Sequence, residues 1–370
     1  MIHHSITTLS PGGGMQTYIK SLLKYRSANM SDQVIFSLKE VDQSQFELLH
    51  VHDQEQLSAV RGECPVVFTL HNHSTYCPSG TKYLEMSQSY CDRKMSTIGC
   101  TWGHIVDGCG SRKPQKIFQS LQNSNRELRL IRRLKIPVIA ISHYSRQQLI
   151  RHGLPPEQVT LLHHGIEIPP ITSSPLTIET HQAQRILFVG RIVPYKGLDW
   201  LLRALTQGES SIQLDVAGEG WDRPRVEQLA KQLGVSDRIT WHGWCNPEKL
   251  DQLYQQCFVV VFPSLWPEPA GLVTLEAYAR YRPVIASKLG GIPEYVRSGE
   301  TGILVEANDS KQLADAITEL ARNYSKSKKM GEQGYKWFLE KFTIDAHTKS
   351  LRDIYEKVIH HFQLQKAFQK

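Results

Sequence analysis

Short apolar runs rich in Val, Ile and Leu alternate with amphipathic stretches through most of the chain. The runs have the length of strands, and the stretches between them carry apolar residues at the three- and four-residue spacing of a helix. Because continuous apolar strands that alternate with helices form parallel sheets covered on both faces, the pattern predicts an α/β fold. The predicted strands are Val34–Leu38, Leu48–Val51, Val66–Leu70, Val138–Ile141, Val159–Leu162, Ile186–Val189, Leu214–Ala217, Ile239–Trp241, Val259–Phe262 and Val284–Ala286. The predicted helices include Leu198–Leu205, Val226–Leu233 and Leu250–Cys257.

A proline-containing break at residues 169–184 divides the chain into two similar halves and predicts a linker. We therefore expect an N-terminal domain over 1–168, a C-terminal domain over 185–343 and a terminal helix within 344–370 that crosses back. Both domains are predicted to be Rossmann-like, doubly wound sheets that face each other across a cleft. Ligands of such sheets bind at the carboxyl ends of the strands.

Residues 74–135 are the exception to the alternation, and they form a cysteine-containing insert followed by a basic helix. Their cysteines are spaced more widely than the CxxC pairs of typical zinc sites, so we expect reduced thiols and no metal. A structural zinc site, or a zinc module for partners, is the alternative. The four cysteines are Cys77, Cys91, Cys100 and Cys109, and the nearby histidines are His71, His73 and His104.

The composition is that of a globular protein, with 40% hydrophobic and 21% charged residues among 370. The longest apolar run, Cys257–Phe262, is far shorter than the roughly 20 residues of a membrane-spanning helix. No Lys or Arg precedes Lys20 and no apolar signal core follows the first residue, so we expect a cytoplasmic protein.

The positive charge is local. The chain has a net charge of +7, from 43 basic and 36 acidic residues, and residues 112–135 alone carry eight basic residues against one acidic residue. Apolar residues recur at helical spacing in the same segment, and a basic amphipathic helix suits an anionic membrane surface. We therefore expect a surface for an anionic partner here, at the inner face of the cell membrane, with an ordinary solvated helix as the alternative. The residues assigned to it are Arg126, Arg129, Arg132 and Arg133.

Two loops that follow predicted strands carry candidate chemistry. Arg191 and Lys196 lie five residues apart after Ile186–Val189, where two cations can neutralise a diphosphate leaving group. Glu268 follows Val259–Phe262 and precedes a predicted helix over Gly271–Tyr281. Amides at that helix start favour an anion, whereas Glu268 suits sugar hydroxyls. Taken singly, the two cations could be solvated, and Glu268 could simply cap the helix.

Together these segments resemble the donor half of the retaining glycosyltransferases of the GT-B fold, in family 4 (group 1). The likeness covers about residues 185–325, and the N-terminal half of the chain resembles the family less closely. His163-His164-Gly165 replaces the family's usual Asn-Gly, a departure that puts no catalytic residue in doubt. The matching positions are Arg191 with Lys196, Gly218-Glu219-Gly220, Glu268 with Glu276, residues 290–294 and 299–302, Pro11 to Gly14, and His71 after Val66–Leu70.

The resemblance implies a role for each position. The catalytic residues would be His71, Arg191, Lys196 and Glu268, with the two cations on the departing diphosphate. The donor nucleotide sugar would be bound by Gly13, Gly14, Gly218, Glu219, Gly243, Ala270, Gly271, Leu272 and Glu276, with Glu276 on the ribose. The implied reaction moves a sugar from a nucleotide-diphosphate sugar to a glycan or lipid-linked acceptor, with retention, in polysaccharide or glycolipid synthesis.

Other function classes fit the sequence less well. It has no GxGxxG dehydrogenase fingerprint, no Walker P-loop and no Asp-x-Asp pair, the metal-holding motif of the other main glycosyltransferase fold. We expect no cofactor, no metal at the diphosphate and no nucleic-acid partner. The alternatives are a GT-B nucleotide-sugar epimerase and a non-catalytic protein that binds nucleotides or lipids through its basic helix.

Overall fold

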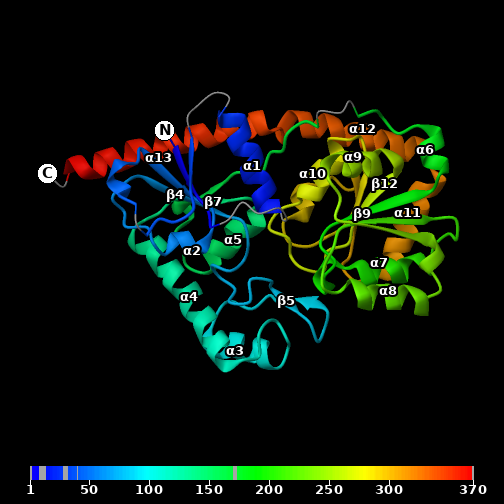
Figure 1. Cartoon of the computed structure of the whole chain (residues 1–370), viewed down its shortest axis with the longest axis horizontal. Coiled ribbons are helices and arrows are strands. Elements are labelled where there is room, and N and C mark those ends of the chain that lie inside the picture. The colour runs from blue at the N-terminus through cyan, green and yellow to red at the C-terminus, as the bar shows by residue number, and fades with distance from the viewer. Residues whose placement is uncertain (1, 8–13, 28–31, 40, 170–172, 369–370) are drawn as a thin grey trace. The chain divides into compact units, whose positions relative to one another are not determined.

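The computed structural model describes residues 2–7, 14–27, 32–39, 41–169 and 173–368. The chain forms two compact units, each built around one parallel sheet (Figure 1). The first unit consists of Met1–Ser87, Cys91–Glu167 and Phe342–Lys370, and the second of Gln88–Tyr90 and Ile168–Lys341. The predicted pair of Rossmann-like sheets is confirmed.

The first unit contains a six-stranded parallel sheet in the order β2-β1-β3-β4-β7-β8. The chain moves outward from β1 to β2 and then crosses to β3 on the other side, which is the doubly wound arrangement. The strands are β1 (Ile2–Ser5), β2 (Gln33–Ile35), β3 (Leu48–Val51), β4 (Val66–Leu70), β7 (Val138–Ala140) and β8 (Val159–Leu161). The helices are α1 (Gly14–Ser27), α2 (Gln54–Leu57), α3 (Thr97–Ile105), α4 (Pro114–Arg133), α5 (His143–Arg151) and α13 (Ile344–Phe368).

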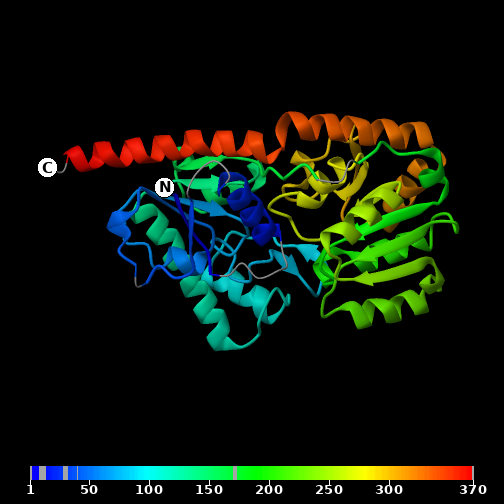
Figure 2. The ribbon, with the colours of Figure 1, turned by 45° about the horizontal axis from the view of Figure 1, so that its top comes forward.

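Helices cover both faces of this sheet, and successive side chains of each strand point to opposite faces. Neighbouring residues of one strand therefore belong to different cores. In β3, Leu48 packs with residues of α1 and α13, whereas Leu49 packs with residues of α4 and α5. Helix α13 therefore completes one of the two cores, and Figure 2 shows it lying along the first unit. Its Leu351 and Tyr355 are buried there.

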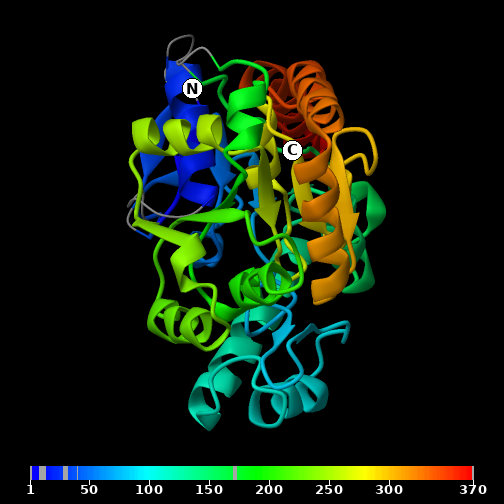
Figure 3. The ribbon, with the colours of Figure 1, turned by 90° about the vertical axis from the view of Figure 1, so that its right-hand side faces the viewer.

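The second unit repeats the architecture with a six-stranded parallel sheet in the order β11-β10-β9-β12-β13-β14 and helices on either side (Figure 3). Its central strand β12 is buried along its whole length, as its continuous apolar sequence requires. The strands are β9 (Arg185–Val189), β10 (Gln213–Ala217), β11 (Ile239–Gly243), β12 (Val259–Phe262), β13 (Val284–Ser287) and β14 (Gly302–Val305). The helices are α6 (Ile178–Gln182), α7 (Leu198–Leu205), α8 (Arg223–Gln232), α9 (Pro247–Gln256), α10 (Leu272–Tyr278), α11 (Ser310–Arg322) and α12 (Tyr324–Lys341).

The insert between β4 and β7 contains little regular structure before α4. It holds the two-stranded sheet of β5 (Tyr83–Leu84) and β6 (Ser89–Tyr90), helix α3 and long connecting loops. In the part of the chain that the structure describes, no helix is long and apolar enough to cross a membrane.

Four elements differ from the predictions. Strand β1 was not predicted, because His3 and His4 interrupt its apolar run, although it lies between β2 and β3 in the sheet. Strand β14 was missed because it begins with Gly302, and the predicted linker contains the short helix α6. Helix α10 ends at Tyr278, earlier than the predicted Tyr281, because the chain turns at Tyr281, whose φ of 57° is left-handed.

The packing of α13 makes a prediction about stability. Leu351→Ala should lower the free energy of unfolding of the first unit by about 2–5 kcal/mol, because it removes buried methyl groups and leaves a cavity. Leu364→Ala in the same helix is the matched control, since Leu364 is 46% exposed and should change stability by less than about 0.5 kcal/mol. Urea denaturation of the full chain measures both. Equal effects of the two substitutions would contradict the packing of α13 on the sheet.

Candidate active site

In the second unit, three loops leave neighbouring strands at the same edge of the sheet. They follow β9, β10 and β12, and β9 lies between the other two strands. The chain runs from β9 outward to β10 and β11, then returns to place β12 on the other side of β9. The gap between the loops after β9 and β12 is therefore the topological switch point, where open α/β sheets bind ligands.

A buried ion pair joins these two loops at the switch point. The Lys196 ammonium contacts Oε1 of Glu268, and their side chains are 16% and 8% exposed. The Ser264 hydroxyl donates to the same oxygen at 2.9 Å. Two predicted catalytic residues, 72 positions apart, are thus held together by charge and by hydrogen bonding.

The pair depends on a close approach of the two loops. Gly197 has a φ of 72°, and a Cβ at this position would lie 1.8 Å from the carbonyl oxygen of Pro263. Only glycine fits such an approach. The amide of Leu265 donates to the carbonyl of Tyr195 at 2.9 Å and fixes the loops to each other. Gly197 therefore positions Lys196 beside Glu268.

Arg191 lies in the same loop as Lys196 with its side chain exposed. Its guanidinium donates to the Tyr195 hydroxyl at 3.2 Å. Within the described residues no carboxylate lies within 4 Å of it. The guanidinium can therefore meet an anion at this edge with most of its donors.

The loop after β10 supports the Arg191 loop through its backbone. A Cβ at Gly218 would lie 1.9 Å from the carbonyl oxygen of Gly190, so the two loops touch here as well. The carbonyl of Glu219 accepts from the amide of Ile192 at 2.9 Å, while its carboxylate pairs with Arg223 at 2.5 Å. The amide of Gly218 in turn donates to the carbonyl of Gly243 at 2.8 Å. This turn therefore sets the position of the cationic loop.

Glu276 lies on α10, close after Ala270, Gly271 and Leu272, the residues predicted to offer amides to an anion. The Tyr254 hydroxyl donates to its Oε2 at 2.9 Å. Burial raises the pKa of Glu276, and the nearby Arg280 guanidinium opposes that effect. The Thr274 hydroxyl, on the first turn of the same helix, is buried without a partner in the described part of the chain. Sequence reasoning did not single out Thr274.

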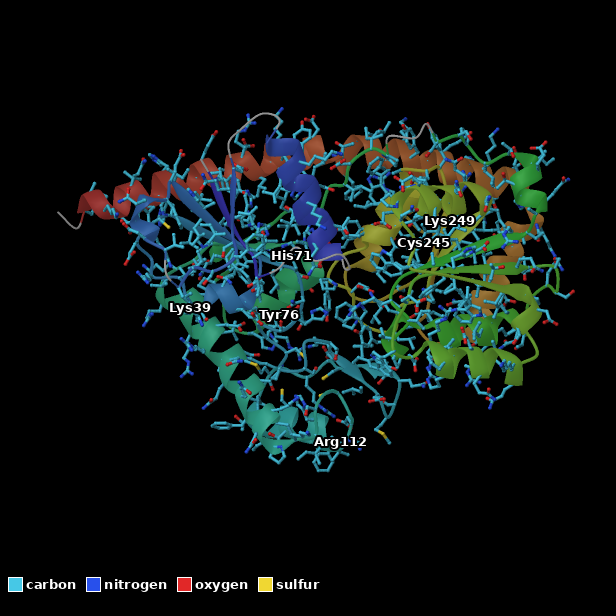
Figure 4. All side chains as sticks on the ribbon, in the orientation of Figure 1. Lys39, His71, Tyr76, Arg112, Cys245 and Lys249 are labelled. Carbon is cyan, nitrogen blue, oxygen red and sulfur yellow. The ribbon has the colours of Figure 1, made fainter. Side chains whose placement is uncertain are left out.

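In the first unit, His71 follows β4 and ends a row of hydrogen-bonded histidines (Figure 4 labels His71). Its Nε2 lies 3.2 Å from Nδ1 of His52, whose Nε2 lies 3.0 Å from Nδ1 of His4. At the opposite end of the row from His71, Oδ2 of Asp32 lies 3.2 Å from Nε2 of His4. The rings stand on or beside three neighbouring strands, β1, β3 and β4.

The carboxylate at the end of the row fixes the proton on each ring. Beside an ionised Asp32, which can only accept, a neutral His4 carries its proton on Nε2 and accepts at Nδ1. Nε2 of His52 must then donate to His4, and Nε2 of His71 must donate to His52. Nδ1 of His71 keeps a lone pair and is buried without a partner among the described residues. His71 therefore offers a hydrogen-bond acceptor, which suits the hydroxyl of a ligand.

Burial favours the neutral form of His71 and His52 in the row, and of two further buried histidines of the first unit, His164 and His347. It lowers the pKa of His71 to about 3 and that of His347 to about 4, and it also lowers the pKa values of His52 and His164. Sequence reasoning found His71 but missed His4, His52 and Asp32. The available signal was a histidine in each of three runs that become adjacent strands. Of the glycines predicted beside His71, Gly13 lies outside the described residues, and Gly14 is the first residue of α1.

Most of the apolar stripe of α4 is not available to a membrane, contrary to the sequence prediction. Leu128 and Ile131 belong to the core of the first unit, and Ile117 and Leu121 are also buried. Helix α4 therefore presents its charged face together with Phe118, which is 63% exposed. The stripe had no distinguishing mark in the sequence, because core-facing and membrane-facing helices share one spacing.

The four predicted arginines of α4 are exposed but differ in their contacts. Arg132 donates to the carbonyl of His152 at 2.6 Å, and Arg129 donates to the carbonyl of Asn125 at 3.2 Å. Arg126 lines a polar groove of about 580 Å³ with Glu127, whose pKa burial raises to about 8. Arg133 lies at the end of the helix. Arg132 thus has a structural contact, whereas Arg126 faces a space that could hold a polar ligand.

Two family models match different halves of the chain. The model for glycosyl transferases group 1 matches residues 178–337, and the model for glycosyltransferase family 4 matches residues 20–168. The chain belongs to the family 4 (group 1) glycosyltransferases. The two matches correspond to the two sheets, so each unit of this family member carries one of the family's two halves.

Relatives of this family member support the assignment. An uncharacterised glycosyltransferase of Methanocaldococcus jannaschii is 32% identical over 173 residues, or 46% of this chain and 44% of that protein. A D-inositol 3-phosphate glycosyltransferase of Mycobacteroides abscessus is 32% identical over 200 residues, or 50% and 45%. The matched region thus spans about half the length of these relatives. Among solved structures, Anabaena HepE in complex with UDP-glucose has a TM-score of 0.74 at 18% identity and covers 96% of this chain and 99% of that chain.

The buried histidines make the first unit of this family member sensitive to acid. Their pKa values in the folded state lie below the ordinary value of 6.5, so the unfolded chain binds protons that the folded chain does not. The stability that they give is full above about pH 7 and is lost as the pH falls through 6.5 toward 4, by up to about 1.4 kcal/mol per pH unit for each ring. Denaturation between pH 7.5 and 5, followed by hydrogen exchange in β3 and β4, measures the loss.

A single substitution tests the assignment of this acid sensitivity. His164→Gln should reduce the slope of stability against pH by about one proton, whatever its effect on stability at pH 7.5. A slope that stays unchanged in this variant, or a first unit with equal stability at pH 7.5 and 5, would contradict the neutral, buried rings.

Proposed function

We propose that this chain transfers a sugar from a nucleotide-diphosphate sugar to a glycan or lipid-linked acceptor. The observation that carries the proposal is the Lys196–Glu268 pair at the switch point of the second unit, with the Arg191 guanidinium in the same loop. A cation next to a carboxylate, both fixed by the fold, suits a substrate that combines an anionic leaving group with sugar hydroxyls.

Each residue has a distinct task in this proposal. Arg191 and Lys196 stabilise the charge on the departing diphosphate, which makes a divalent metal ion at the diphosphate unnecessary. Glu268 accepts hydrogen bonds from hydroxyls of the donor sugar, and Glu276 accepts from the ribose. In the first unit, the lone pair on Nδ1 of His71 accepts from a substrate hydroxyl.

We propose that transfer retains the anomeric configuration and occurs on the face of the leaving phosphate, which takes the acceptor's proton. A double displacement would need a carboxylate nucleophile. The strands of the first unit lead into His71 and Ser142, and the carboxylate of Asp53, which follows β3, accepts from the amides of Thr7 and Gln56 instead. That carboxylate is occupied as a helix cap and is a poor nucleophile.

The names of similar proteins support this class of reaction. The HepE structure contains UDP-glucose, and the mycobacterial relative is named for transfer to an inositol phosphate. An epimerase would use the same donor but would make no new glycosidic bond. A protein that only binds nucleotides or lipids would not need a carboxylate for sugar hydroxyls beside the cation, as in the Lys196–Glu268 pair.

We further propose that the insert attaches the protein to an anionic membrane surface through α3. Ile98, Trp102 and Ile105 lie on one face of this helix and are 87%, 58% and 51% exposed. Exposed basic residues stand close by in the chain: Arg112, Lys113 and Lys116. An apolar stripe next to cationic residues matches the boundary between acyl chains and anionic headgroups. Membrane attachment would bring the enzyme to a lipid-linked acceptor.

Glu268→Gln should reduce transfer at least about tenfold, or about 1.4 kcal/mol in the barrier, because the neutral amide stabilises developing positive charge less well. Transfer is measured with a panel of nucleotide sugars, first as nucleotide release and then by anomer analysis of the product. Glu306→Gln is the matched control, since Glu306 is an exposed glutamate that pairs with Lys288 at the surface. Full activity of a folded Glu268→Gln variant would overturn the role of Glu268. An inverted product would overturn the retaining mechanism.

The α3 stripe predicts salt-sensitive binding to membranes. Sedimentation with vesicles of anionic lipid should fall at least about tenfold when Ile98, Trp102 and Ile105 are changed to Ser, because the apolar contact is lost. The wild-type binding should weaken with salt, since exposed charges are screened within about 8–10 Å. The matched control is Trp221→Ser, which changes a 71% exposed tryptophan of the second unit. Unchanged sedimentation of the triple variant would contradict attachment through α3.

A further inference from the structure

All four cysteines of the insert line one small cavity within the first unit. The cavity has a volume of about 20 Å³, and its sulfur-bearing residues come from different segments. Cys77 follows β4, Cys91 follows β6, Cys100 is on α3 and Cys109 lies between α3 and α4. All four are free thiols. The four cysteines are widely spaced in the sequence, but the fold brings them to one cavity.

A fifth donor, His104, lines the same cavity. Its Nδ1 lies 3.0 Å from the carbonyl oxygen of Ser111, which can only accept, so Nδ1 carries the proton. Its Nε2 therefore holds a lone pair, and this atom is buried without a partner in the described part of the chain. A histidine that ligates a metal is typically held in this way, by a backbone carbonyl on its other nitrogen.

The local geometry brings these donors toward each other. Cys100 and His104 lie one turn apart on α3, opposite the exposed apolar stripe of that helix. A Cβ at Gly110 would lie 2.7 Å from Cε1 of His104, and a Cβ at Gly103 would lie 3.2 Å from Sγ of Cys109. Glycine at these two positions allows the loop with Cys109 to pack directly against α3.

The electrostatics of the cavity favour a negatively charged cluster. Lys82 lines the cavity, is 2% exposed and donates to the carbonyl of Arg93 at 3.2 Å and to the amide oxygen of Gln148 at 3.3 Å. No described carboxylate pairs with its ammonium group. A buried cation is costly unless it is paired. Metal-bound thiolates carry net negative charge and would supply the missing partner.

The histidine row of the first unit shows why the cysteine cavity is the better metal site. Among the described residues, His4, His50 and His52 form the one group of three donor atoms within 4.8 Å of one another. Both nitrogens of each ring already have protein partners, His50 through Thr69 and Tyr355. They have no lone pair left for an ion. The cysteine sulfurs stand farther apart, on three loops and on α3. Binding an ion would draw these segments closer together.

We propose that the insert binds a structural zinc ion through four of these five donors, His104 among them. Sulfur and imidazole ligands select zinc over magnesium or calcium, and a closed tetrahedral set is typical of structural sites. Each binding thiol releases its proton to solvent, and no oxidation is involved. The ion would order a segment that has little apolar core of its own, and so hold α3 in place.

The test begins with the metal content of the full-length protein purified without chelators. We expect about one zinc per chain by elemental analysis. His104→Ala should lose at least about nine-tenths of it, and so should three of the four single Cys→Ser variants at positions 77, 91, 100 and 109. Cys245→Ser is the matched control, because Cys245 is a free thiol of the second unit (Figure 4), and it should keep the full zinc content. Cobalt added to the metal-free protein should give the strong visible absorption of tetrahedral thiolate coordination.

The outcomes separate this proposal from catalysis. Removing zinc should speed proteolysis of the insert, and zinc but not magnesium should reverse that change. Wild-type protein without bound metal that also fails to bind added zinc or cobalt would overturn the site, as would disulfides among the four cysteines under reducing conditions. Full zinc content in His104→Ala would overturn the role of His104. None of these measurements depends on transferase activity, so the proposed function can fail independently.

Discussion

The loops of the second unit depend on one constraint, the close contact between the chain after β9 and the chain after β12. Gly197 permits the contact, and the buried pair of Lys196 and Glu268 then fills it. Removing both charges from water is expensive, and a hydrophobic pair of similar size would stabilise the fold as well or better. Backbone hydrogen bonds join the loop after β10 to the loop that carries Arg191, and join that loop in turn to the one after β12. The ionic pair is therefore better explained by the proposed chemistry of this edge than by its contribution to stability.

The sequence was most informative where a buried strand leads into a distinctive loop. Val259–Phe262 could only be a buried strand, and the loop after it, with Glu268, follows from the family pattern. That pattern spans 72 residues between Lys196 and Glu268, so their pairing could be inferred from resemblance but not from spacing. Strand β1 shows the opposite case, because His3 and His4 look polar in sequence and are buried by the neighbouring strands. The role of Asp32 in fixing the proton on His71 needed the register of three strands.

Helices α3 and α4 show a second limit of sequence patterns. Both carry apolar stripes near basic residues, but the sequence analysis considered a membrane surface only for the longer helix, α4. In the structure the stripe of α4 belongs to the core, whereas Ile98 and Trp102 of the short helix α3 are exposed. Spacing indicates that a face is apolar, but it does not indicate what covers that face. Only the packing of the unit distinguishes a core helix from a surface one.

The return of α13 to the first unit has a consequence for synthesis on the ribosome. The residues that begin the first unit's sheet are translated first, yet Tyr18 hydrogen-bonds to His347 and His50 to Tyr355. These partners emerge only after the whole second unit. The second unit is continuous apart from three residues and can fold as soon as it is made. The first must wait with part of one face of its sheet, the part under α13, uncovered. The part of the chain that is translated first is therefore completed last, and in the interval it presents an apolar surface to chaperones.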